Sequence, residues 1–367
     1  MDLQKRNYGI DLLRVVAMFF VIVLHALNQG GLIDIITPDS IQYPYVCLLE
    51  IFVYCAVDIF ALISGYVSYN KETKYKNYIS LWFQVVFYLL LITIVYQIVN
   101  PSIVAKKDYI RSFFPVSGDR YWYFTAYTGL FLLKPLIDKS INAMDVNSLK
   151  KVFVVIVIGF SVWDIFINRF TLRGGYSVIW IVLLYIVGAI VKKCEIGKNL
   201  KHYQTIVLML VFVLITHLVK MYGKDNYYII NDIFNLYINK NILVNYTSPT
   251  ILGIAILFVI SFSKLQFKGR IKNIISFASV SAFSVYLLNT HYLFWELHMK
   301  NLFADMVHSS VLKIYVVVLG FSLLFVLASI LIDKVRLFVF KVLRISVLSE
   351  KIAEGLNKLL AKISDWL

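Results

Sequence analysis

An apolar stretch near the N-terminus holds the first residues whose types could do chemistry. The stretch "DLLRVVAMFFVIVLHAL", residues 11–27, is apolar enough to cross a membrane, yet it contains Asp11, Arg14 and His25. A charged side chain at such a depth is costly unless it faces protein or water, so it is a candidate for function. The structural alternative is that Asp11 neutralises Arg14 across one helical turn.

The spacing of Arg14 and His25 predicts a shared helix face. The two residues are eleven positions apart, and at about 100° per residue they return to within about 20° of each other. The helical rise separates them by roughly 16 Å along the axis. An imidazole in this position could act as a general base, although a hydrogen-bonded structural histidine fits the pattern as well.

A second apolar stretch, "CAVDIFALISGYVSYN", carries Asp58, which we expect near the middle of the membrane. A buried carboxylate must be paired, protonated or solvated. Asp58 either orients the His25 imidazole, as a carboxylate orients a catalytic base, or neutralises Arg14 from a neighbouring helix. The sequence leaves both possibilities open.

Two further stretches hold candidate substrate-binding residues. "SAFSVYLLNTHYLF" brings Ser284, Asn289 and His291 onto one predicted helix, with His291 at its outer end, which is the level of His25. "DRYWYFTAYTGLFLLKPLID" places Trp122 and Tyr123 at the start of a predicted span, where an aromatic belt at the lipid headgroups is the structural alternative.

The elements that position these residues are membrane-spanning helices. The chain has 367 residues, of which 60% are hydrophobic and 16% charged, against roughly 45–50% and 25% in soluble proteins. This composition predicts an all-α, polytopic transmembrane helix bundle of about ten spans, surrounded by membrane lipid. The predicted spans are 8–28, 46–69, 79–99, 121–137, 152–168, 177–192, 204–221, 242–263, 273–294 and 312–333.

The distribution of basic residues predicts the orientation of the bundle. Of the 36 Lys and Arg residues, 24 fall in one set of alternate connections and 11 in the other, and Arg14 lies within a helix. The positive-inside rule therefore places both termini in the cytoplasm of a bacterial cell. The net charge of +15 follows from this bias, so we expect no nucleic acid as a partner. The protein partners are unknown.

The sequence predicts two parts, a membrane-embedded domain over 1–340 and a cytoplasmic amphipathic tail over 341–367. In the tail, apolar residues recur at spacings of three and four with Lys and Glu between them, which is typical of an interfacial helix. We expect no metal site, because the chain has three cysteines and its histidines lack ligand spacing.

These stretches together resemble the acyltransferase-3 family of integral-membrane acyltransferases, which modify surface polysaccharides, peptidoglycan and lipids. The family's first helix carries an Asp, an Arg three residues on and a His after ten more, as at Asp11, Arg14 and His25. The later motifs of the family are matched by "VDIFALISGY" (57–66), "WYFTAYTGLFLLKP" (122–135) and "YLLNTH" (286–291).

The resemblance implies an O-acyltransferase whose donor is a cytoplasmic acyl-CoA, usually acetyl-CoA, and whose acceptor is a hydroxyl of a cell-surface glycan or its lipid-linked precursor. On this hypothesis His25 is the general base, with Asp58 as its carboxylate, and Arg14 holds a CoA phosphate. Trp122, Tyr123 and His291 are the expected substrate-binding residues.

Two other functions remain open from the residues alone. In a transporter or flippase of a glycan intermediate, Arg14, Asp58 and His25 would line the path. In a structural or sensory membrane subunit, the same charges would be only buried pairs.

Overall fold

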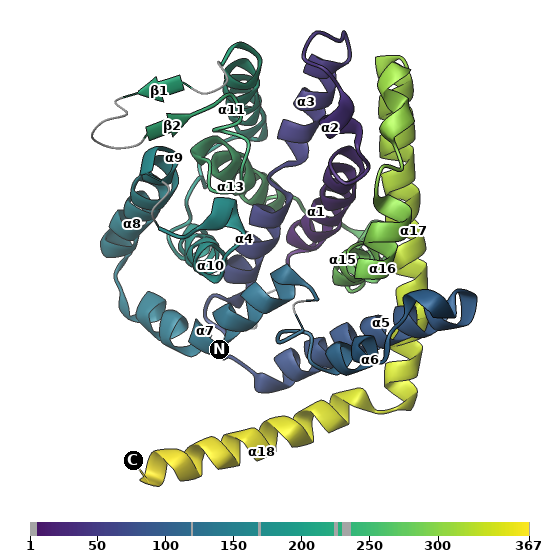
Figure 1. Ribbon diagram of the computed structural model, residues 1–367. Helices are drawn as coiled ribbons and strands as arrows, with labels where there is room; N and C mark the ends of the chain where they lie inside the picture. Colours follow the sequence, from purple (N-terminus) through teal and green to yellow (C-terminus); the bar gives the residue numbers. More distant parts are fainter. Residues whose placement is uncertain (1–5, 119, 168–169, 224–226, 230–235, 367) are drawn as a thin grey trace.

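Helices dominate the computed structural model (Figure 1), which describes residues 6–118, 120–167, 170–223, 227–229 and 236–366. The helices are α1 (Tyr8–Leu27), α2 (Leu32–Ile35), α3 (Tyr43–Val53), α4 (Ala56–Ser68), α5 (Tyr75–Val99), α6 (Lys106–Phe113), α7 (Trp122–Ala143), α8 (Val146–Val155), α9 (Trp163–Ile167), α10 (Val178–Lys193), α11 (His202–Tyr222), α13 (Pro249–Ser263), α14 (Gly269–Ser279), α15 (Ala282–Asn289), α16 (Tyr292–Phe294), α17 (Val311–Val342) and α18 (Ile345–Trp366). Short 3₁₀ or π turns lie at η1 (Pro101–Ile103), η2 (Ile156–Val162), η3 (Arg173–Gly175), η4 (Trp295–Met299) and η5 (Ala304–His308). A small antiparallel pair, β1 (Tyr227–Ile229) and β2 (Leu236–Ile238), is the one departure from an all-α fold within the described part of the chain.

Six helical segments among the described residues are long and apolar enough to cross a membrane, which supports the prediction of a membrane protein. They are Tyr8–Ile35, Tyr43–Ser68, Tyr75–Val99, His202–Tyr222, Gly269–Asn289 and Val311–Val342. The count of about ten spans stays a prediction, as does the orientation of the bundle. The predicted span 152–168 and two predicted connections, 169–176 and 220–241, lie partly outside the described residues.

Helix α1 runs through the centre of the bundle (Figure 1). It packs against α3, α4, α13, α14, α15 and α17. Residues on different sides of the helix, including Leu13, Ala17 and Ile22, are fully buried, as expected for a helix that is apolar all round. The Asn7 side chain begins the helix by accepting a hydrogen bond from the Ile10 N–H at 3.1 Å, which satisfies one of the free N–H groups of the first turn.

Helices α4 and α10 approach each other closely because two glycines face the crossing. A Cβ on Gly65 would lie 1.9 Å from the Tyr185 carbonyl oxygen, and a Cβ on Gly188 would lie 2.0 Å from that of Leu62. Only a glycine fits at either position, as at other close helix crossings in membranes. This contact fixes the position of Asp58 relative to α10.

Two of the predicted spans are broken helices. The predicted span 46–69 is interrupted between α3 and α4, at Tyr54 and Cys55, and the span 273–294 is divided among α14, α15 and α16. The chain then enters the π turn η4, which begins at Trp295. Breaks and π turns often accompany functional sites, because they redirect side chains that a regular helix would point elsewhere.

The C-terminal helix α18 crosses the end of α17 and lies against α5 (Figure 1). An ion pair between Lys76 of α5 and Glu350 of α18 joins them at 2.9 Å. The apolar positions of α18 that remain exposed include Leu348, Ile352 and Leu359. The structure therefore confirms an amphipathic C-terminal helix, while its place at a membrane surface stays a prediction.

Candidate functional site

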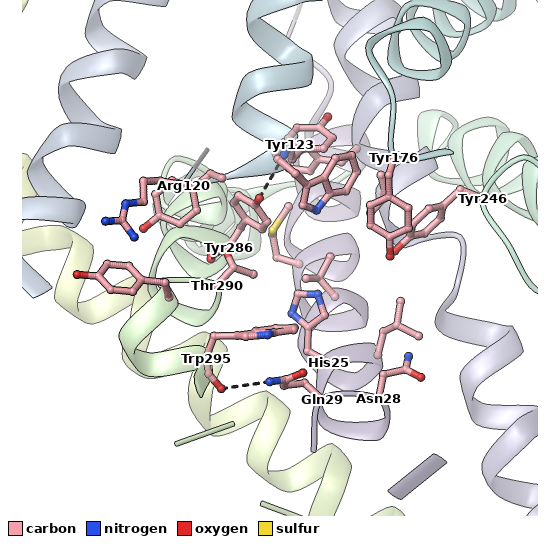
Figure 2. Close-up of a pocket in the computed structure, with 18 of the residues that line it drawn as sticks. His25, Asn28, Gln29, Arg120, Tyr123, Tyr176, Tyr246, Tyr286, Thr290 and Trp295 are labelled. Atoms are coloured by element: carbon pink, nitrogen blue, oxygen red, sulfur yellow. Dashed lines mark hydrogen bonds between the residues drawn. The ribbon is translucent and has the colours of Figure 1, made fainter. Parts of the chain in front are cut away.

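A cavity of about 650 Å³ lies beside the C-terminal half of α1 (Figure 2). A cavity of this size and apolar character is typical of a small-molecule site. Its lining residues are Met18, Val21, Leu24, His25, Asn28, Gln29, Asp34, Tyr54, Val57, Phe60, Arg120, Tyr121, Trp122, Tyr123, Tyr176, Tyr246, Phe283, Tyr286, Thr290, Tyr292, Trp295 and Glu296.

His25 is held at the cavity by one strong hydrogen bond. Its Nδ1 lies 2.5 Å from the Oδ1 of Asn289. Because an amide oxygen only accepts, Nδ1 carries the proton in this arrangement, and Nε2 carries the lone pair. The Trp295 ring meets the imidazole edge to face, with ring centres 4.7 Å apart. The ring is thus fixed in position while Nε2 stays available to a substrate.

The fold brings Asn289 to His25 from the far end of the chain. Asn289 is the last residue of α15, which packs along α1, and its side chain is fully buried. The chain breaks immediately afterwards at Thr290, so the amide stands at the end of a helix next to the imidazole. Its Nδ2 has no hydrogen-bond partner in the described part of the chain, which leaves His25 as the side chain that the amide binds.

Half of the residues that line the cavity carry a Phe, Tyr or Trp ring (Figure 2). Trp122 packs on Tyr176, and Tyr176 on Tyr246, with ring centres 4.7 and 5.2 Å apart. Next to Trp122, the Tyr123 backbone N–H donates to the Tyr286 hydroxyl at 3.3 Å. Trp122 and Tyr123, two of the expected substrate-binding residues, therefore line the same cavity as His25.

Asp58 lies behind this wall and is fully buried. Its Oδ1 accepts a hydrogen bond from the Trp180 indole N–H at 3.0 Å, while its Oδ2 has no partner among the described residues. Neither arrangement considered from the sequence is present, because His25 binds Asn289 and Arg14 binds Asp11. The structure assigns Asp58 to the contact between α4 and α10.

Arg14 lies toward the other end of α1 and is not among the lining residues of the cavity. Its Nη1 donates to Asp11 Oδ1 at 2.9 Å, and Arg6 Nε donates to Asp11 Oδ2 at 2.5 Å. One carboxylate is thus shared by two guanidinium groups. The side chain of Arg14 remains 29% exposed.

His291 lies outside the cavity, because the chain changes direction after α15. It lies in the turn before α16, where its Nδ1 accepts a hydrogen bond from the Leu293 N–H at 3.4 Å. The side chain is fully buried and is not among the lining residues. The structure thus places Asn289 of the "YLLNTH" stretch, rather than His291, beside His25.

The ion pair of Arg120 and Asp108 lies at the rim of the cavity. Arg120 Nη2 donates to Asp108 Oδ1 at 2.6 Å and its guanidinium lies over the Tyr292 ring, 4.0 Å from the ring centre. Burial disfavours the Asp108 carboxylate, but hydrogen bonds from the Ala105 N–H and from Arg120 outweigh this effect and hold its pKa below the ordinary value. The pair fixes α6 against the segment that leads into α7.

Several lining residues were not predicted from the sequence. Tyr54, Tyr176, Tyr246 and Trp295 come from helix breaks and connections, where an aromatic residue is ordinarily assigned to the headgroup belt. The available signal was the density of Tyr and Trp in segments predicted to lie at one side of the membrane.

The comparisons with known proteins give one match. The model of a protein family described as "Acyltransferase domain" matches residues 7–334, which include both ends of α1 and the whole cavity. No curated protein and no solved structure matches the chain.

Proposed function

Because the chain belongs to the acyltransferase-3 family, we propose that it is a membrane-bound O-acyltransferase. It moves an acyl group, which we expect to be acetyl, from acyl-CoA on the cytoplasmic side. The acceptor is a hydroxyl of a cell-surface glycan or of its lipid-linked precursor. The N-terminal end of α1 faces the cytoplasm, and the His25 end faces the acceptor.

The observation that carries this proposal is the state of His25. The imidazole lines a cavity of about 650 Å³, its Nδ1 is bound by Asn289, and its Nε2 has no hydrogen-bond partner in the described structure. A neutral histidine held in this way is suited to act as a general base on a hydroxyl group. Asn289 takes the orienting position for which Asp58 was considered from the sequence.

The transfer then needs only the substrates and His25. Nε2 takes the proton of the acceptor hydroxyl while the oxygen attacks the thioester carbonyl carbon. The carbon–sulfur bond breaks, and the imidazolium returns the proton to the departing thiolate. The new bond is an ester, and the CoA thiol is released. Asn289 accepts from Nδ1–H throughout, so the ring keeps its orientation in both protonation states.

The aromatic wall supports a glycan as the acceptor. Sugar rings present apolar C–H faces and polar edges, and aromatic side chains bind such amphipathic surfaces well. Trp122 and Tyr123 supply these faces beside His25, and the carboxylates of Asp34 and Glu296 lie among the lining residues as acceptors for hydroxyl groups.

Arg14 supports the donor at the other end of α1. Its guanidinium has five N–H donors, of which the contact with Asp11 uses one. The remaining donors suit a CoA phosphate. The separation of roughly 16 Å between Arg14 and His25 along the helix axis is comparable to an extended pantetheine arm.

The test replaces His25 and measures the product. In cells that express His25→Gln at the wild-type level, ester-linked acyl groups on the surface glycans should fall by about 10²- to 10⁴-fold. Mass spectrometry of the glycans identifies the group added and the sugar that bears it. His298→Gln is the matched control, because this exposed histidine lies on η4 and does not line the cavity. Normal acylation by a well-folded His25→Gln variant would contradict the proposal.

A further inference from the structure

A second cavity, of about 520 Å³, lies at the opposite end of α1 from His25. Its lining residues are Arg6, Asn7, Tyr8, Ser263, Leu265, Gln266, Phe267, Lys268, Gly269 and Lys272. Tyr8 and His25 are separated by seventeen residues of one helix, or about 26 Å along its axis. The second cavity is therefore a distinct site, formed by the start of α1 and the connection from α13 to α14.

Positive charge is concentrated around one tyrosine in this cavity. The Lys272 Nζ lies 4.7 Å and the Arg6 Cζ 5.3 Å from the centre of the Tyr8 ring. Lys268 lines the same cavity, and none of the ten lining residues is acidic. Cations that line one cavity raise its electrostatic potential, so the arrangement favours a negatively charged ligand.

The described part of the chain supplies a carboxylate to Arg6 but to neither lysine of the cavity. The Asp11 carboxylate is shared between Arg6 and Arg14. Lys268 and Lys272 form no ion pair with any residue that the structure describes. The cavity therefore keeps a net positive charge that its neighbours do not neutralise.

The start of α14 adds backbone donors to these side chains. Lys268 is the N-cap of this eleven-residue helix, and no side chain caps its first turn. Gly269 adopts a φ of +58°, and a Cβ at this position would meet nothing within 4 Å. The first N–H groups of α14 therefore have no capping side chain among the described residues, and such groups bind phosphate oxygens.

We propose that this cavity binds a phosphate or diphosphate group. The cations, the open helix terminus and the volume of the cavity all suit the oxygens of a phosphoryl group. One source is the nucleotide end of the acyl-CoA donor, and this assignment depends on the proposed function. The other source is the headgroup of an anionic lipid, which presents the same chemistry.

The experiment measures phosphate binding by the full chain in detergent. Inorganic pyrophosphate is titrated calorimetrically into the wild type and into Lys272→Gln, and we expect the dissociation constant to rise about tenfold. Lys268→Gln should weaken binding in the same direction. Arg270→Gln is the matched control, because it removes the same charge from the same turn of α14 at a position that does not line the cavity. We expect a change of less than about twofold in the control.

Two further titrations separate the sources. If the donor is the ligand, Lys272→Gln weakens coenzyme A binding about tenfold, whereas pantetheine, which lacks the diphosphate, binds the wild type and the variant equally. If a lipid is the ligand, coenzyme A binding is unchanged, and the variant loses the thermal stabilisation that phosphatidylglycerol nanodiscs give over phosphatidylcholine nanodiscs. Equal pyrophosphate affinity in the wild type and Lys272→Gln would overturn the site. That result would leave the proposed function intact, because acyl transfer is judged separately through His25.

Discussion

The two ends of helix α1 carry opposite kinds of sites. At the C-terminal end, His25 lines a cavity in which half of the lining residues are aromatic, and a single amide orients its ring. At the N-terminal end, Tyr8 lies in a cavity with Arg6, Lys268 and Lys272 and no acidic lining residue. Helix α1 thus connects an aromatic cavity at its C-terminal end with a basic cavity at its N-terminal end.

The two cavities are suited to different interactions with a substrate. Aromatic walls exclude water, so a single hydrogen bond to His25 acts in a low-dielectric setting where it is strong and insensitive to salt. The cations at the other end are partly exposed, with the Arg6 side chain 48% accessible, and their attraction for an anion is screened by solvent. We therefore expect the cavity with His25 to orient the substrate and transfer a proton, and the basic cavity to bind an anionic group.

After His25 itself, the largest effect should come from Asn289. In Asn289→Leu the Nδ1 proton loses its acceptor, the ring is free to change tautomer, and turnover should fall by about 10²-fold. The measurement is the rate of acyl transfer against pH, because a residue that only packs would not alter the pH profile. Asn289→Asp retains an oxygen at the same position and should restore part of the rate. An unchanged profile in Asn289→Leu would remove the orienting role.

The next largest effect should be confined to the acceptor. Trp122→Ala removes one aromatic face from the cavity wall and should raise the KM for the glycan by about fivefold to tenfold. The KM for acyl-CoA should not change, because Trp122 lies far along the bundle from the basic cavity. Trp163→Ala is the control, since this exposed tryptophan does not line either cavity. A change in the KM for acyl-CoA alone would contradict the assignment of the glycan to the cavity with His25.

A smaller effect concerns stability at the rim of the aromatic cavity. The pKa of Asp108 is lowered in the folded chain, so its ionised form stabilises the fold. This contribution, about 2 kcal/mol for a charged hydrogen bond, is fully present above the ordinary Asp pKa of about 3.9. It is lost as the pH falls through the lower folded pKa.

The check is thermal unfolding of the wild type and Asp108→Asn in detergent across this pH range. The wild type should be more stable by a constant amount above about pH 5, and the difference should shrink on further acidification. Asp305→Asn, at an exposed position, should change the free energy of unfolding by less than about 0.5 kcal/mol. A difference that grows as the pH falls would contradict the sign of the Asp108 effect.

The smallest effect is the salt dependence of the two KM values, which report on the two ends of α1. Raising the salt concentration from about 0.05 to 0.5 M shortens the screening length several-fold. The KM for acyl-CoA should rise by about threefold, since the basic cavity binds charge, while the KM for the glycan should stay constant. Equal salt dependence of both constants would show that the ends do not differ in the way proposed.

Much of the fold could be predicted from the sequence, because membrane helices are encoded locally. Apolar runs identified the helices that became α1, α5, α11 and α17, and the spacing of apolar residues in the tail predicted the amphipathic helix α18. The breaks within the spans 46–69 and 273–294 were missed, since an apolar run gives no sign of where its backbone hydrogen bonds are interrupted.

The candidate site was likewise predicted only in part from the sequence. The sequence alone determined that α1 carries Arg14 and His25 on one apolar helix, because helical periodicity and hydropathy are properties of consecutive residues. It also indicated that the "YLLNTH" stretch reaches the level of His25. The tertiary structure decided that Asn289, 264 residues away, binds the imidazole, that Asp58 binds Trp180 and that Arg6 gathers with Lys268 and Lys272. These pairings depend on how helices pack and where they break, which is set by long-range contacts that no local pattern contains.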